Sequence, residues 1–143
     1  MRATPTVLRA LVRDLSVEAL RRRPEPGEWS PAEVICHLAD TEERALGRVQ
    51  RMLTDDDPEL SGYDQAALAV ERGYDELDPF AELDRYERLR GDHLALLGGL
   101  DDAGWRRTGR HSEQGPMTVE LYVTHVAAED VDHLAQLARP LMT

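Results

Sequence analysis

Two side chains that can bind a metal ion lie four residues apart near the C-terminus, Glu129 and His133 in the segment TVELYVTHVAAEDVDHLAQL. On a helix, a carboxylate and an imidazole with this spacing point to one spot, and a divalent ion there would offset the cost of burying them. Tyr122, Val126 and Leu137 continue the same line along the helix, so we expect the line to face the core. The alternative is an ordinary Glu–His pair on the surface, in a stripe that drifts toward solvent.

Three further side chains on other predicted helices could contribute to such a site. His37 lies at the edge of the apolar stripe of a helix predicted over residues 31–53, and periodicity alone indicates a partly exposed histidine. Glu42 on the same helix is expected to face inward, which is unusual for a glutamate. His93 falls on the core face of a helix predicted over 79–98, as a rival ligand or as a core histidine bonded to a neighbour. Glu42 and His93 are also the candidates for a general base.

A basic segment, WRRTGRH, precedes the last predicted helix of this acidic chain. Its cationic side chains could bind the carboxylates of a small thiol or substrate; they are Arg106, Arg107, Arg110 and His111. The alternative is a solvated loop whose arginines pair with surface acids, which contributes little energy. The single cysteine, Cys36, is interpreted as a small packing residue and not as a nucleophile.

Charge and composition exclude several classes of function. Asp and Glu number 28 against 17 Lys plus Arg, for a net charge of -11, and such a surface repels the phosphate backbone of nucleic acids. One cysteine cannot form an internal disulfide, which fits a reducing cytoplasm. No segment has the pattern of a signal peptide or approaches the roughly 20 apolar residues of a membrane span. We therefore expect a cytoplasmic protein with neither nucleic-acid nor membrane partners.

Helix-start signals divide the chain into amphipathic segments. These signals lie at Thr4-Pro5, Ser30-Pro31-Ala32-Glu33, Asp78-Pro79 and Thr118. They predict main helices over residues 5–20, 31–53, 79–98 and 118–139, and Ser16 can restart the first of them. No stretch has a convincing strand pattern, and residues 54–77 form a long connection between the second and third main helices. The chain is therefore predicted to be a single domain, 1–143, folded as an all-α four-helix bundle, an architecture that places metal sites in its core.

These segments resemble the DinB-like superfamily of metal-binding four-helix bundles. The matching stretches are PEPGEWSPAEVICHLADTEE, FAELDRYERLR, GWRRTGRHSEQGPMTVE and EDVDHLAQL, in this order over nearly the whole chain. The WS…HLAD segment and the HLAQ end are the most specific of them. The resemblance implies one metal site, built from the histidine of the HLAD segment and two histidines four residues apart in an HDxxH segment.

In this chain the resemblance places the metal ligands at His37, Glu129 and His133. Glu129 replaces the middle histidine of many relatives, and a glutamate is an adequate zinc ligand. A similar His, Glu, His set occurs in the mycothiol-dependent maleylpyruvate isomerase branch of the superfamily. His125 lies one turn before Glu129 and would substitute if Glu129 does not bind. The implied cofactor is one divalent ion, zinc first and nickel next.

Three protein ligands leave an open coordination position, which is typical of a catalytic rather than a structural site. The resemblance implies first an S-transferase that activates a low-molecular-weight thiol on the metal and adds it to an electrophilic substrate. The alternatives are a metal-dependent hydrolase of small amides or esters and a non-catalytic, stress-related bundle that binds metal. Resemblance to dimeric relatives also implies a homodimer.

Overall fold

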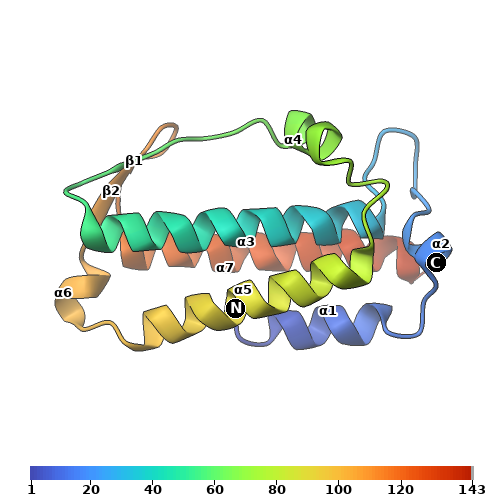
Figure 1. The fold of residues 1–143 in the computed structure, drawn as a ribbon, viewed down its shortest axis with the longest axis horizontal. Helices are drawn as coiled ribbons and strands as arrows, with labels where there is room; N and C mark the ends of the chain where they lie inside the picture. Colours follow the sequence, from blue (N-terminus) through green and yellow to red (C-terminus); the bar gives the residue numbers. More distant parts are fainter. Residues whose placement is uncertain (143) are drawn as a thin grey trace.

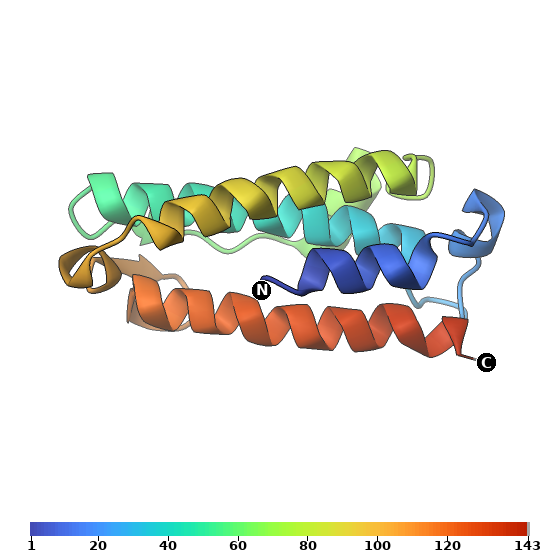
Figure 2. The ribbon, with the colours of Figure 1, turned by 90° about the horizontal axis from the view of Figure 1, so that it is seen from below.

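Four long helices form the body of the protein in the computed structural model, which describes residues 1–142. Helices α1 and α3 both pack against α5 and α7 (Figure 1, Figure 2). The predicted all-α four-helix bundle is therefore confirmed. The long helices are α1 (Thr4–Val12), α3 (Pro31–Thr54), α5 (Pro79–Gly98) and α7 (Val119–Ala138). Shorter helical segments join them: α2 (Val17–Leu20), α4 (Gln65–Arg72), α6 (Asp102–Trp105) and η1 (Arg139–Leu141).

The starts of the three longest helices follow from local chemistry. Ser30 and Glu33 form a complete capping box at α3: the Ser30 hydroxyl accepts from the Glu33 amide, and the Glu33 carboxylate accepts from the Ser30 amide. Asp78 and Thr118 cap α5 and α7 through their side-chain oxygens. These caps satisfy amide groups that have no partner inside the helix, and they set where each helix begins.

The N-terminal segment confirms the predicted restart at Ser16 and differs from the prediction at Thr4. Residues 5–20 form two helices, because the backbone is extended at Ser16, whose hydroxyl accepts from the Ala19 amide and caps α2. The start signal at Thr4-Pro5 indicated that Thr4 would cap α1, but the cap position is Ala3. Thr4 is the first residue of α1, and its hydroxyl donates to the buried Asp130 carboxylate at 2.7 Å. A buried carboxylate needs donors, and the packing of α1 against α7 supplies this one.

A small three-stranded sheet closes one end of the bundle, next to the C-terminal end of α3 (Figure 1). Strands β2 (Thr108–His111) and β3 (Gly115–Thr118) form an antiparallel hairpin, and β1 (Glu59–Leu60) pairs in parallel with β2. No strand is predicted here from the sequence, because strands this short offer no alternation that could identify them. The sheet ties the connection between α3 and α5 to the segment before α7.

A buried polar layer separates the two larger apolar clusters of the core. Along α3, Ala32, Val34, Ile35, Leu38 and Ala39 belong to one of them, and Ala45, Val49 and Met52 belong to the other. Cys36 packs in a third, small cluster with Ala69 and Tyr74. Between the two larger clusters lie charged and polar side chains that are nearly inaccessible to solvent: Glu42, Arg90, His93 and Asp130. Burial of such groups is tolerated when each is paired. None of the helices within residues 1–142 is long and apolar enough to cross a membrane.

Candidate metal centre and its cavity

A cavity of about 210 Å³ lies between α3 and α7, beside the buried polar layer. Its wall includes Thr41 from α3, Tyr63 from the connection to α4, His111 from the hairpin, and Glu129 and His133 from α7. These residues come from distant parts of the chain, and helix packing together with the small sheet brings them to one place. The cavity is large enough to admit a small molecule.

Two histidines from facing helices meet beside this cavity, and of the two His133 lines its wall. His37 of α3 and His133 of α7 place their Nε2 atoms 3.1 Å apart. Two nitrogen ligands that each lie about 2.0–2.1 Å from one tetrahedral ion are separated by about 3.3 Å, so the observed pair is close to that geometry. The predicted third ligand, Glu129, has its Oε2 3.6 Å from His133 Nε2. The residues present therefore fit a divalent ion.

Neighbouring groups hold the two imidazoles with their Nε2 atoms facing each other. His133 Nδ1 lies 2.9 Å from the Gln136 amide oxygen, so Nδ1–H donates there and Nε2 keeps its lone pair. The ring of His37 is fully buried and packs against Trp29, with ring centroids 5.0 Å apart. Burial and, next, the nearby His133 lower the pKa of His37 to about 4, which keeps it in the neutral form that binds metals.

Burial differs from the prediction at two of these positions. The prediction of a partly exposed His37 is wrong, because Trp29 and His133 pack against its ring. The prediction that Glu129 faces the core is also wrong, since its side chain is 58% exposed. The buried carboxylate of α7 is the next residue, Asp130, which an ion pair stabilises inside the bundle. Glu129 lines the cavity with an exposed side chain.

The third metal ligand stays a prediction. Across residues 1–142 no three His, Cys, Asp or Glu side chains already converge as a complete metal cluster. The two imidazoles do converge, and the Glu129 carboxylate lies 3.6 Å from one of them, His133. His125, the alternative third ligand, is half-buried and lines the same cavity.

Glu42 and His93 belong to a closed cluster beside the cavity. Glu42 Oε1 lies 2.7 Å from His93 Nδ1, and Glu42 Oε2 accepts from Arg90 at 2.8 Å. Arg90 also donates to Asp130 twice, at 2.6 and 2.8 Å. Burial by itself would raise the pKa of Glu42, but hydrogen bonds from His93 and Arg90 hold that pKa below its ordinary value. A carboxylate with both oxygens engaged and a lowered pKa is a poor general base at neutral pH.

The basic segment does not converge on the cavity. Arg107 donates to backbone carbonyl groups at the end of α3, and Arg110 pairs with Asp57 at 3.2 Å. Arg106 lines a separate, open depression beside α6 and α7. Of the four basic candidates, His111 is the one that lines the cavity between α3 and α7. The two arginines Arg107 and Arg110 therefore act mainly to hold the sheet against the end of α3.

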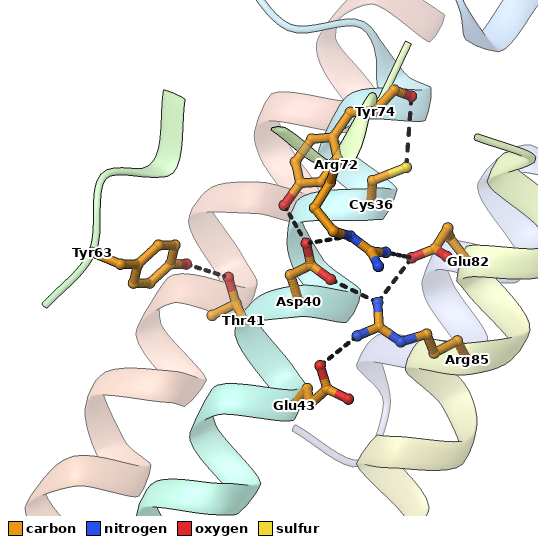
Figure 3. A network of polar contacts seen from close by, with 9 residues as sticks. All are labelled: Cys36, Asp40, Thr41, Glu43, Tyr63, Arg72, Tyr74, Glu82 and Arg85. Carbon is orange, nitrogen blue, oxygen red and sulfur yellow. Dashed lines mark hydrogen bonds and ion pairs between the residues drawn. The ribbon is translucent and has the colours of Figure 1, made fainter. Parts of the chain in front are cut away.

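Tyr63 reaches the candidate site from the connection that arches over α3 (Figure 1, Figure 3). Its hydroxyl lies 3.1 Å from Thr41 Oγ1, which is itself 3.4 Å from His37 Nε2. The guanidinium of Arg44 covers the Tyr63 ring at 4.0 Å from its centroid. Tyr63 cannot be found from the sequence, because its segment has no regular pattern and only the fold brings it over the site.

Asp40, the residue before Thr41, anchors the same connection on another face of α3 (Figure 3). Its carboxylate accepts from the Tyr74 hydroxyl and from Arg85 of α5, both at 2.7 Å. Burial and the hydrogen bond to Asp40 raise the pKa of Tyr74 well above its usual range, so the phenol stays protonated and donates. In the sequence, the place of Asp40 in the HLAD segment was the signal that could have identified it as a functional residue.

The chain is similar to other proteins along nearly its whole length. The profile of the DinB superfamily matches residues 1–137. A protein of Oceanobacillus iheyensis is 29% identical over 133 residues, which cover 93% of this chain and 77% of that protein. The protein YfiT of Bacillus subtilis is 28% identical over 140 residues, which cover 94% of this chain and 78% of YfiT. Both relatives carry the name "Putative metal-dependent hydrolase".

The solved structure of YfiT from Bacillus subtilis shares the arrangement of the helices. The TM-score is 0.81 at 27% sequence identity, and the match covers 96% of this chain and 81% of that chain. That protein is described as "a probable metal-dependent hydrolase with an unusual four-helix bundle topology". Because the family profile extends from the first main helix almost to the end of the last, and the fold agrees, the chain belongs to the DinB superfamily.

Proposed function

We propose that this protein is a divalent-metal-dependent hydrolase of small amides or esters, with the ion held by His37, Glu129 and His133. The observation that carries the proposal is the 3.1 Å approach of His37 Nε2 to His133 Nε2 beside a cavity. The names of the relatives from Oceanobacillus iheyensis and Bacillus subtilis support hydrolysis over other uses of such a site. Zinc is the expected ion, and nickel is the next choice.

The chemistry divides between the ion and the chain. When bound, a divalent ion with three protein ligands supplies an open position that polarises a carbonyl group and lowers the pKa of water. Gln136 holds the ring of His133 by accepting from Nδ1–H. The Tyr63 hydroxyl, held beside Thr41, can donate to a substrate oxygen close to the two imidazoles. The cavity of about 210 Å³ restricts the substrate to a small molecule.

A thiol S-transferase is the second candidate, because the same open position would activate a thiol. The chain supplies no such thiol itself. Cys36 is buried, and burial followed by the nearby carboxylates Glu82 and Asp40 raises its pKa to about 12. A low-molecular-weight thiol would therefore act as a cosubstrate, as in the maleylpyruvate isomerase branch that the His, Glu, His set resembles. A non-catalytic, stress-related metal-binding bundle is the remaining alternative.

The test compares these reactions in one protein preparation. Protein made without a His-tag is freed of metal, reloaded with zinc or nickel, and offered small esters and amides, and separately several thiols with an electrophile. We expect metal-dependent hydrolysis that disappears in His133→Ala. Metal-dependent thiol addition without hydrolysis would replace the proposal with the transferase. Absence of both reactions, together with a large loss of stability on chelation, would support the non-catalytic bundle.

We also propose a homodimer at micromolar concentration, on the resemblance to dimeric relatives. Sedimentation over a range of concentrations tests this assembly. A profile that stays at one 16.1 kDa chain at every concentration would contradict it.

A further inference from the structure

We propose that Arg48 binds a carboxylate of the substrate at one end of the cavity, and that the His37–His133 pair lies at the opposite end. The substrate would then be a small, elongated molecule with one carboxylate at one end and the ester or amide at the other. The placement of the ester or amide beside the two histidines rests on the proposed hydrolase function. The carboxylate site rests separately on the place of Arg48 in the cavity wall and on its lack of an acidic partner.

The register of α3 against α7 places Arg48 at a defined distance from the two histidines. His37 contacts His133, and Arg48 contacts Tyr122, so the two helices run in opposite directions with the same eleven-residue separation on each (Figure 1). Eleven residues of α-helix span about 16 Å. Arg48, Tyr122 and His133 all line the same cavity. A molecule in the cavity can therefore meet the metal donors at one end and a guanidinium at the other.

Arg48 is held in place without a carboxylate partner. Its Nη1 donates to the Tyr122 hydroxyl at 3.4 Å, its Nη2 donates to the Ser61 carbonyl, and its guanidinium lies 5.8 Å from the centroid of the Tyr122 ring. Among residues 1–142 no carboxylate oxygen comes within 4.0 Å of it. The other arginine of the cavity wall, Arg90, is neutralised by Glu42 and Asp130.

The lack of a carboxylate partner at Arg48 is informative because the chain has 28 acidic and only 17 basic residues. Acidic partners are abundant, yet the half-buried cation at the cavity wall has none. A guanidinium presents a planar fork of N–H donors that matches a carboxylate in two parallel hydrogen bonds. Contacts to a phenol and a backbone carbonyl hold Arg48 in place but leave its charge uncompensated, and a carboxylate ligand would compensate it.

The surrounding charges favour a single carboxylate over a phosphate. Glu113 and Glu129 line the same cavity, and neither is paired with Arg48. A phosphate with close to two negative charges at neutral pH would be repelled by both of them, whereas a monoanion meets half of that repulsion. A carboxylate therefore suits the cavity better than a phosphate group does.

The experiment measures binding directly, by calorimetric titration of the full chain with hexanoate, with its neutral analogue hexanamide, and with inorganic phosphate, each with and without zinc. We expect hexanoate to bind more tightly than hexanamide and phosphate. Arg48→Gln should weaken hexanoate about tenfold or more, because a charge-assisted bidentate contact is lost. The hexanoate affinity of Arg48→Lys should lie between those of the parent and Arg48→Gln, since lysine keeps the charge but cannot form two parallel hydrogen bonds.

Arg51→Gln is the matched control, with the same charge change on the same helix at an exposed side chain outside the cavity wall. It should leave hexanoate binding unchanged, and circular dichroism should show that all three variants are folded. Equal hexanoate affinity in Arg48→Gln and the parent, tighter phosphate binding, or equal hexanamide binding would overturn the inference. If the protein binds hexanoate through Arg48 but has no hydrolase activity, the proposed function is wrong and the carboxylate site is still supported.

Discussion

Two groups of buried polar side chains lie next to each other in this bundle and solve the problem of burial in opposite ways. In the closed cluster of Glu42, Arg90, His93 and Asp130, opposite charges sit within hydrogen-bonding distance. In the open pair, His37 and His133 face each other with their Nε2 atoms beside a cavity. The cluster compensates its charges within the chain, whereas the pair presents two donors that an external cation would satisfy.

The comparison separates a structural use of polar residues from a functional one. A buried charge that is already paired ties the helices together and has little capacity for new chemistry. Two imidazoles that converge from separate helices are the arrangement expected of a metal site. Both groups contain a buried histidine, so burial by itself does not identify the metal site. The partner of each histidine identifies it: His93 contacts the Glu42 carboxylate, whereas His37 contacts a second imidazole, His133.

The largest effect should come from opening the closed cluster. Arg90→Ala leaves Glu42 and Asp130 as buried carboxylates without their shared cation, which should cost about 3–5 kcal/mol in the free energy of unfolding. Urea denaturation followed by circular dichroism measures this loss. The exposed Arg88 on the same helix supplies the control, since Arg88→Ala should change stability by no more than about 0.5 kcal/mol. A similar small loss for both variants would show that the cluster is not what holds the helices.

Removal of one imidazole of the open pair should act on the metal instead. We expect His133→Ala to weaken zinc binding more than about 100-fold, because even residues that only orient ligands are worth about 10–100-fold. His125→Ala, at the other histidine of α7 that lines the cavity, should keep most of the affinity. Competition with a chromogenic chelator measures both. The opposite ranking of the two variants would make His125 the ligand.

Substitutions of the third ligand sharpen the assignment. Glu129→Ala should weaken zinc binding by about tenfold or more, whereas Glu129→His should retain or tighten it, because histidine is a common zinc ligand at this coordination distance. The same chelator competition, run on the parent and both variants, separates the outcomes. If Glu129→Ala binds zinc as tightly as the parent, then Glu129 is not a ligand and the exposed side chain seen here stays at the rim.

How far the sequence predicts this molecule depends on how local each feature is. Caps at Ser30, Asp78 and Thr118 are local hydrogen bonds, and they were predictable together with the helices that they start. The small sheet was not, because strand β1 has two residues and its pairing joins segments some fifty positions apart. The register of α7 was also misjudged by one position: the periodic stripe pointed to Glu129, and the buried carboxylate is Asp130.

The burial of Asp130 in place of Glu129 has a physical cause that the periodicity of one helix cannot reveal. Asp130 is buried because Arg90, forty positions away, reaches it from α5, and a pattern within one helix carries no information about such a partner. The convergence of His37 with His133 was predicted through family resemblance, since their side chains come from separate helices. Arg48 and Tyr63 have no local signal at all, and only the folded chain places them on the cavity.

The pH dependence of stability should also differ between the open pair and the rest of the protein. The pKa of His37 falls from an ordinary 6.5 to about 4 in the folded chain, so between these values the unfolded chain binds the proton and the folded one does not. The contribution of His37 is therefore full above pH 6.5 and is lost as the pH falls toward 4, by at most about 1.4 kcal/mol per pH unit. Urea unfolding of metal-free protein across this range should show a shallower slope for His37→Gln than for the parent, and parallel slopes would contradict the assignment.

The central claim is that His37 and His133 are two ligands of one metal ion. An anomalous-difference map from zinc-loaded crystals, measured on both sides of the zinc absorption edge, tests it most directly. We expect one strong peak per chain within about 2.0–2.1 Å of both Nε2 atoms, with a Glu129 oxygen as the third contact. A peak centred on His93 or on His125 without His37, or the absence of any peak between the two imidazoles in fully loaded protein, would contradict it.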